Sequence, residues 1–386
     1  MIRWATTVLL LAACAPVASQ AQQTPAWSLD ARQRLLAGPP GQRDQELAER
    51  QQLLAQGEAR LAAGDADGAR SAFERASQLL HAADTEQSLV RAFMQAGDYR
   101  QALAFAAHAA GAHRDAPAGT ALYAWLLHVG GQGRYAERTL ADALQLTPDD
   151  DALRAARTAW SGAWPLADGV LAAGPARTLP YAWGALVPNA ATAVGSALLL
   201  ADGQSAWVPT ALLAGAQRVW VRNGLGEAAE AAVDLQADAA LPAIALPAAL
   251  SLLRWSKPLP RPAELTPPAR QPYAGSPAYL LEYATGPGNS AAWPLMRQGF
   301  FGRTAADGGL NALNISTQPG PGGGVVFDAA GHVLGVAITD PQGREHWWPL
   351  ATTPSAGAAA PPAPRMPVDA LYESGLRVAL QVIVQR

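Results

Sequence analysis

Hydroxyl and imidazole side chains lie on both sides of one glycine run in the last quarter of the chain. Ser316 and Thr317 precede the run 322–324, and His332 and His346 follow it. A hydroxyl held by an imidazole, with a third group to orient the imidazole, performs nucleophilic hydrolysis. We expect His332 at an exposed turn, which disfavours such a pair. The run is not a phosphate loop, because no Lys and Ser/Thr follow it and it leads into a strand. A hydrolase with a displaced nucleophile stays open as an alternative.

A single cysteine, Cys14, lies near the start of the chain. It excludes an internal disulfide framework, a Cys-ligated zinc site and a catalytic cysteine in the later domains. The residues Leu11-Ala12-Ala13-Cys14 resemble a bacterial lipobox, which implies lipidation of Cys14. Ser19-Gln20-Ala21 fits ordinary signal peptidase instead. We expect residues 1–21 to be an export signal, so the protein is periplasmic or a membrane-anchored lipoprotein of a Gram-negative-type bacterium.

Composition limits the classes of partner. The chain has 386 residues, 50% of them hydrophobic, and a net charge of -3. These values exclude wholesale disorder and disfavour nucleic-acid binding. After the signal, no run of 18 apolar residues predicts a membrane span. We expect no cofactor and no metal site; His128 has no second ligand at i+4.

Residues 40–165 contain a helical repeat. Gly64, Gly97 and Gly131 recur at gaps of 33 and 34 residues, and alanines recur in register with them. Such a period indicates stacked helical hairpins, with each glycine ending a first helix in the left-handed conformation. The pattern resembles the tetratricopeptide repeat, in three units at 50–82, 83–115 and 116–149. A generic array of helical hairpins is the alternative.

The resemblance implies a concave groove lined by the first helix of each unit. One groove column would contain Glu58, Arg91 and Trp125, and the next Leu61, Met94 and His128. Such a groove could bind an extended peptide or a helix of a protein partner. Alternatively, these side chains pack against the rest of the same chain.

Residues 166–352 read as β-structure. Short apolar runs are bounded by turn residues, without helices between them, which argues for an all-β barrel or sandwich. The runs are Ala197–Leu200, Arg218–Val221, Ala278–Leu281, Gly324–Phe327 and Val333–Ile338.

The order of these pieces resembles a chymotrypsin-fold serine protease of the bacterial periplasmic, trypsin-like type. Residues 195–203 resemble the first-barrel strand and hairpin, and 207–216 the strand and turn that carry the catalytic histidine. Residues 320–328 with 331–336 resemble the nucleophile loop and the hairpin behind it. The resemblance implies a double β-barrel, and the whole chain is expected to be an α + β multidomain protein.

The positions that the resemblance assigns to catalysis carry no catalytic side chains. Gly322 stands at the nucleophile position and Leu212 at the base position. The orienting Asp falls near Leu241, within a few residues. Glycine and leucine can neither attack a carbonyl nor take a proton. We therefore predict a pseudoprotease rather than an enzyme.

The degenerate loop could keep a binding function. The backbone N–H groups of Gly322, Gly323 and Gly324 could attract an anion, and the cleft between the barrels could hold a peptide strand. Alternatively, the loop is only a tight turn and side chains fill the cleft.

The C-terminal region is expected to begin with an Ala/Pro linker at 353–367 and to end in a helix at 368–386. Leu371, Leu376 and Leu380 contribute to an apolar stripe on that helix. The function expected from all these features is binding or scaffolding of peptides or proteins in the cell envelope. A structural envelope lipoprotein is a further alternative.

Overall fold

A computed structural model describes the backbone of most of the chain after residue 39. The described residues are 40–161, 167–234, 249–260, 272–286, 288–303, 311–317, 322–339, 344–350 and 363–386. The export signal with Cys14, most of the Ala/Pro linker and Leu241 lie outside these ranges. Predictions on those residues therefore stay predictions.

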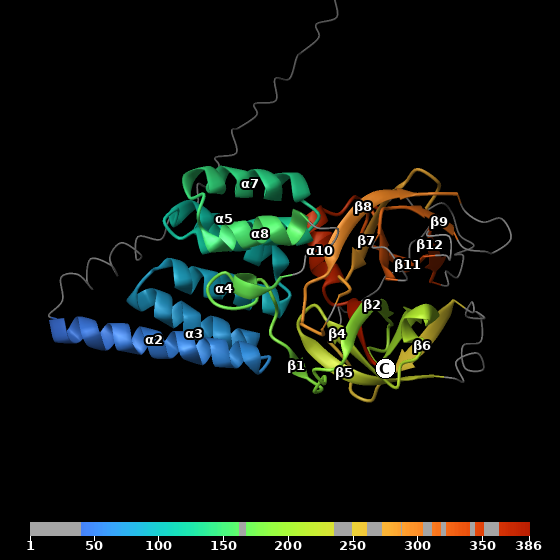
Figure 1. Cartoon of the computed structure of the whole chain (residues 1–386), viewed down its shortest axis with the longest axis horizontal. Coiled ribbons are helices and arrows are strands. Elements are labelled where there is room, and N and C mark those ends of the chain that lie inside the picture. The colour runs from blue at the N-terminus through green and yellow to red at the C-terminus, as the bar shows by residue number, and fades with distance from the viewer. Residues whose placement is uncertain are drawn as a thin grey trace, which may run out of the picture.

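The N-terminal part is a stack of antiparallel helices, each packed on the next in chain order (Figure 1). The helices are α2 Pro40–Ala62, α3 Ala66–Leu79, α4 Ala83–Ala96, α5 Tyr99–Ala112, α6 Pro117–Val129, α7 Gly133–Leu146 and α8 Asp151–Ser161. Among the described residues, no helix is both long and apolar enough to cross a membrane.

One glycine follows the first helix of each helical hairpin, as the spacing of the three glycines predicts. Gly64, Gly97 and Gly131 have φ of 81°, 82° and 80°, the left-handed conformation that glycine adopts without strain. The amide of Gly97, for example, donates to the Met94 carbonyl at 3.0 Å. The alanines in register with these glycines, such as Ala69 and Ala102, are fully buried between helices. The relation to the tetratricopeptide family itself remains a prediction.

The first β-barrel has six strands closed in the order β5-β4-β13-β2-β3-β6, and a short β1 extends from β5. The strands are β1 Trp183–Gly184, β2 Thr192–Leu199, β3 Ser205–Pro209, β4 Arg218–Asn223, β5 Glu227–Val233, β6 Leu250–Arg254 and β13 Ala379–Gln385. A short 3-10 helix, η2 Thr210–Leu213, follows β3, and η1 Gly169–Leu171 lies between the helices and this barrel. Its interior holds Leu199, Val208, Leu253 and Val382.

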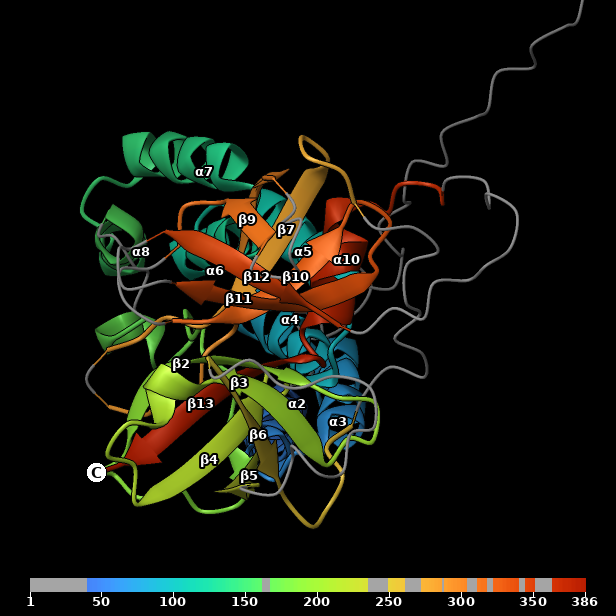
Figure 2. The same cartoon turned by 90° about the vertical axis from the view of Figure 1, so that its right-hand side faces the viewer.

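The second barrel is closed in the order β10-β11-β12-β9-β8-β7 (Figure 2). The strands are β7 Pro277–Glu282, β8 Leu295–Phe301, β9 Asn311–Asn314, β10 Gly324–Asp328, β11 Val333–Thr339 and β12 Glu345–Pro349. Leu280, Phe301, Val326 and Trp347 fill its interior. The expected α + β architecture with a chymotrypsin-like double β-barrel is thus confirmed, and all five predicted apolar runs lie in strands or extend them by one residue.

The predicted C-terminal helix at 368–386 is only partly right. The helix α10 covers Val368–Gly375, and residues 379–385 form the strand β13. This strand lies between β2 and β4, with Leu380 opposite both Ala197 and Asn223. Its residues are buried on both faces, so they show no polar alternation, and Val382, Ile383 and Val384 favour a strand because they are β-branched.

The helices and the barrels share one apolar core. A continuous cluster runs from Phe73 and Met94 in the helices to Leu198 in the first barrel, Leu281 in the second and Tyr372 in α10. The Tyr99 and Tyr372 rings meet edge-on with centroids 4.5 Å apart. The helical stack therefore packs directly against the barrels and is not connected to them through a linker alone.

Candidate functional site

The two barrels meet where the sequence placed the nucleophile and base positions. A Cβ added to Gly195 of β2 would lie 2.4 Å from the Gly322 carbonyl oxygen and 2.8 Å from Leu212 Cδ1. Gly322, at the start of the second-barrel loop, and Leu212, in η2 of the first barrel, are thus near neighbours. The fold brings together the two positions, Gly322 and Leu212, to which the resemblance assigns the nucleophile and the base.

The loop of Gly322, Gly323 and Gly324 packs closely on the first barrel. The Ser196 amide donates to the Gly322 carbonyl at 2.7 Å. Gly323 has φ of 66°, and a Cβ there would lie 2.7 Å from the Ser196 carbonyl oxygen. This close approach requires glycine, because any side chain would meet the backbone of β2. The tight-turn interpretation of the loop therefore fits better than an open cleft at this point.

The side chains at this junction are apolar or already occupied. Leu212 is 2% exposed and belongs to the core of the first barrel. The Ser196 hydroxyl is fully buried and accepts a hydrogen bond from the Tyr283 amide at 2.8 Å. A Ser, His and carboxylate within mutual reach are not found among the described residues around Gly322.

The residues of the displaced-hydrolase alternative lie apart from the junction. His332 Nδ1 pairs with Asp328 Oδ2 at 2.7 Å in the turn between β10 and β11. Asp328 ends β10, four residues after the strand begins at Gly324, so the extended rise places this turn about 13 Å from the start of the strand beside the glycine loop. The Thr317 hydroxyl donates to Glu345, and Ser316 is exposed. His346 lies on β12, opposite Ile338.

The first predicted groove column is covered by the chain itself. Arg91 pairs with Glu58 and donates to the carbonyl oxygens of Gly174 at 3.1 Å and Pro175 at 3.4 Å. The Tyr181 hydroxyl also donates to Glu58. Gly174, Pro175 and Tyr181 of the same chain therefore lie against this column, which fits the internal-packing alternative better than a free groove.

In the second groove column, Leu61 and Met94 are buried and His128 is half-buried. Leu61 and Met94 have no exposed surface, and Trp125, from the first column, is 4% exposed. The His128 ring stacks on Trp160 with centroids 5.0 Å apart. Burial lowers the pKa of His128 to about 4, with a smaller contribution from Arg297, so this imidazole is neutral at pH 7. Leu61 and Met94 therefore belong to the apolar core, and His128 packs on α8.

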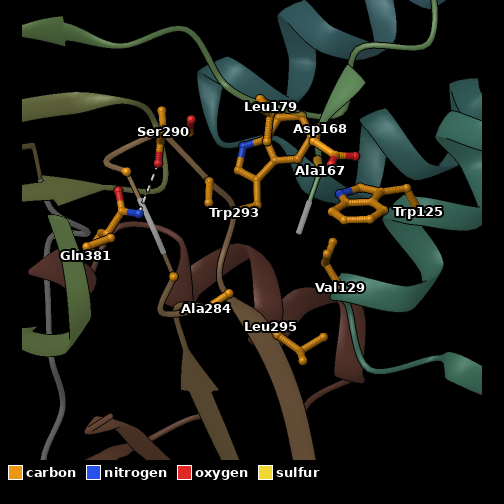
Figure 3. Close-up of a pocket in the computed structure, with 15 residues that line it drawn as sticks. Trp125, Val129, Ala167, Asp168, Leu179, Ala284, Ser290, Trp293, Leu295 and Gln381 are labelled. Atoms are coloured by element: carbon orange, nitrogen blue, oxygen red, sulfur yellow. Dashed lines mark hydrogen bonds between the residues drawn. The ribbon is translucent and has the colours of Figure 1, made fainter. Parts of the chain in front are cut away.

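A pocket of about 250 Å³ lies between α6 and the two barrels (Figure 3). Trp125, Trp293 and Asp168 lie at one side of it, and Gln381 donates to the Ser290 carbonyl at the other, at 3.1 Å. The indole nitrogens of Trp125 and Trp293 are buried, and neither forms a hydrogen bond with a described residue. Aromatic faces beside a carboxylate suit a cationic group. The sequence analysis assigned only Trp125 to a binding surface, because the pocket is assembled from segments far apart in the chain.

Comparisons with known proteins show likeness only in structure. The sequence matches no protein-family model and no curated protein. Among solved structures, the HtrA-type protease AlgW with a decapeptide has 17% identity and a TM-score of 0.29, covering 40% of this chain and 48% of that chain. The serine endoprotease from Yersinia pestis has 15% identity and a TM-score of 0.28, covering 40% and 53%. The match spans about half the length of those proteins.

Proposed function

We propose that this protein is an exported, non-catalytic binding or scaffolding protein of the bacterial cell envelope, built on a degenerate trypsin-like protease fold. The observation that carries the proposal is the contact of Gly195, Leu212 and Gly322 at the barrel junction. Gly322 and Leu212 stand at the positions that the resemblance assigns to the nucleophile and the base, and neither side chain can attack a carbonyl or take a proton. An acyl-enzyme needs such a nucleophile.

The pocket beside α6 is the place that we propose for a partner. The indole rings of Trp125 and Trp293 line the pocket, and Asp168 supplies a negative charge. A basic side chain or an amino terminus of a partner protein would pair with that carboxylate and lie against the indoles. Ligand pockets are typically lined by apolar side chains, and a few polar groups within them fix the orientation of the ligand.

Covalent labelling tests the loss of catalysis. The folded mature protein is treated with a fluorophosphonate probe beside an active serine hydrolase, and intact mass is measured. We expect the probe mass on the hydrolase and none on this protein. A stoichiometric adduct would refute the proposal, and Ser316→Ala and Thr317→Ala would then show whether the nucleophile is one of those two hydroxyls.

A matched pair of variants tests the binding half of the proposal. Asp168→Asn removes the pocket charge without changing its shape, and Asp149→Asn removes an aspartate whose side chain is 95% exposed. We expect the wild type and Asp149→Asn to capture the same envelope protein. Asp168→Asn should fail to capture it. Equal recovery by all three proteins would exclude the pocket as the binding site.

A further inference from the structure

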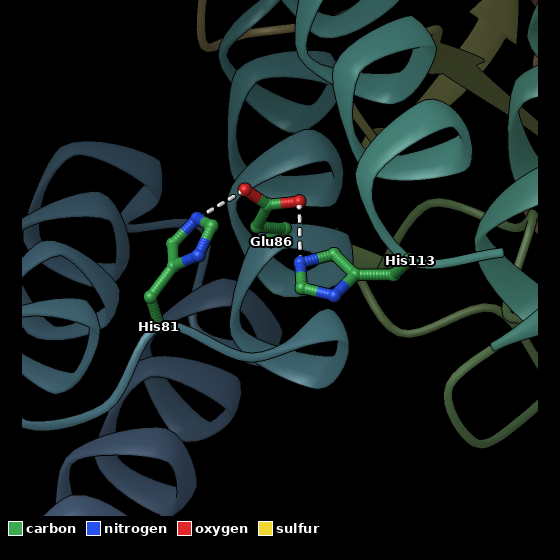
Figure 4. A group of neighbouring side chains, drawn as sticks. All are labelled: His81, Glu86 and His113. Atoms are coloured by element: carbon green, nitrogen blue, oxygen red, sulfur yellow. Dashed lines mark hydrogen bonds and ion pairs between the residues drawn. The ribbon is translucent and has the colours of Figure 1, made fainter. Parts of the chain in front are cut away.

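Three of the chain's six histidines converge on one buried carboxylate in the helical region (Figure 4). Glu86 lies in the first turn of α4, and its side chain is 3% exposed. His81 precedes α4, His108 lies on α5, and His113 caps the end of α5. The cluster therefore joins the ends of two consecutive helical hairpins.

The distances bring the imidazole nitrogens to the carboxylate from several sides. His81 Nε2 lies 2.5 Å and His108 Nε2 lies 3.2 Å from Glu86 Oε1, and His113 Nε2 lies 3.2 Å from Glu86 Oε2. The ligand atoms of His81, Glu86 and His113 all lie within 4.8 Å of one another. Metal–nitrogen and metal–oxygen bonds of about 2.0–2.2 Å fit a cation between them after small side-chain adjustments.

The electrostatics of the cluster favour a cation. Glu86 forms ion pairs with the three histidines, and no guanidinium or ammonium group of the described residues pairs with it. Imidazoles that bind a metal are neutral, so the cation itself would supply the positive charge that a buried carboxylate requires. Glu86 Oε2 and His113 Nε2 are buried, and neither forms a hydrogen bond with a described residue, although they face each other. This arrangement is expected if a lone pair of Glu86 Oε2 and a lone pair of His113 Nε2 both point at one cation position.

We propose that His81, Glu86 and His113 bind a divalent first-row transition metal, with Zn²⁺ as the best fit, and that His108 or a water completes the shell. Imidazole and carboxylate ligands suit this class of ion, and four-coordinate sites need no further protein group. The ion would fasten the α3–α4 connection to the C-terminal end of α5. This site is independent of the proposed function of the barrels.

The sequence gives little warning of this site. His81 and Glu86 are five residues apart, as are His108 and His113, whereas helical ligand pairs on one face are spaced by three or four. The ligands come from a loop, a helix start and a helix end. The expectation of no metal site is therefore replaced here by a proposal.

Metal titration tests the site. The full mature chain is prepared without a polyhistidine tag, stripped with chelator and titrated with Zn²⁺ by calorimetry, against His81→Gln/His113→Gln. We expect one ion per chain at low-micromolar or tighter Kd, weakened at least about tenfold in the double variant. Zn²⁺ should also raise the Tm of the wild type and leave that of the double variant unchanged.

His332→Gln is the matched control, because His332 pairs with a single carboxylate, Asp328, outside the cluster. It should bind Zn²⁺ as the wild type does. Circular dichroism without metal checks that each variant folds, and the single variants His81→Gln and His113→Gln replace the double variant if it does not. Binding of Zn²⁺ by the wild type no tighter than by the cluster variants would overturn the proposal.

Discussion

At the scale of single residues, several side chains have roles that only the fold could assign. Arg91, Trp125 and His128 were expected on a groove surface, and all three serve the interior. Gly174 and Pro175 contact Arg91, and Trp160 of α8 lies against Trp125 and His128; no local pattern in the repeat helices reports such covering segments. Leu212 shows the converse, because its apolar type alone predicts the core position that it has in the first barrel.

His128 makes the stability of the protein sensitive to acid. Its pKa of about 4 lies below the ordinary value of 6.5, mainly because of burial, so the unfolded chain binds a proton more readily. His128 therefore contributes to the free energy of unfolding above pH 6.5, and this contribution is lost as the pH falls from 6.5 towards 4. The 2.5-unit difference corresponds to roughly 3 kcal/mol.

The variant His128→Phe tests this sign. Phenylalanine can still stack on Trp160 but cannot titrate. We expect the free energy of unfolding, measured by urea denaturation at pH 7 and pH 4.5, to fall less in the variant than in the wild type. An equal loss in both proteins would mean that His128 is accessible enough to titrate in the folded state.

At the scale of elements, the strand β13 decides whether the first barrel closes. It pairs with β2 on one side and β4 on the other, so its backbone amides are committed to two neighbours. Leu380, which is fully buried, lies near the start of the strand. A proline there removes a ladder hydrogen bond and clashes with a neighbouring strand.

Paired variants of Leu380 separate the backbone from the side chain. We expect Leu380→Ala to fold cooperatively with a free energy of unfolding lower by about 2–5 kcal/mol. Leu380→Pro should give no cooperative thermal transition by circular dichroism. If the proline variant melts like the alanine variant, the pairing of β13 contributes little to the fold.

Most elements could be predicted from local signals. The glycines at a 33–34 residue period locate the hairpins, and the turn at Asp328–Gly331 locates β10 and β11. The strand β13 was not predicted, because burial on both faces removes the alternation of apolar and polar residues that marks a strand. Its leucine, Leu380, fits a helical apolar stripe equally well. Register, closure and the metal cluster depend on long-range contacts that one sequence does not reveal.

At the scale of the whole molecule, polar contacts as well as the shared apolar core connect the helical stack to the rest of the fold. The Gln95 amide side chain bonds both the amide and the carbonyl of Tyr181, and Arg100 pairs with Glu373 of α10. Arg91 and Trp125 lie in the buried boundary between the stack and the segments that cover it. Removal of these two side chains should therefore weaken the entire structure.

The variant Arg91→Ala/Trp125→Ala tests that connection. A free groove would leave stability unchanged, whereas buried Trp→Ala alone costs about 3–5 kcal/mol. We expect a clearly lower Tm in a single transition by calorimetry. The control Tyr135→Ala, whose side chain is 68% exposed on α7, should stay within about 0.5 kcal/mol of the wild type. An unchanged Tm in the double variant would restore the free groove.

The position of β13 after the second barrel in the sequence also bears on the order of assembly. During synthesis, N-terminal segments leave the ribosome first, and here the helices could form while the barrels are still incomplete. The first barrel cannot close until β13, its sixth strand, has been made, and β13 follows the second barrel in the sequence. A product of premature termination would expose the open edges of β2 and β4, which invite aggregation or proteolysis.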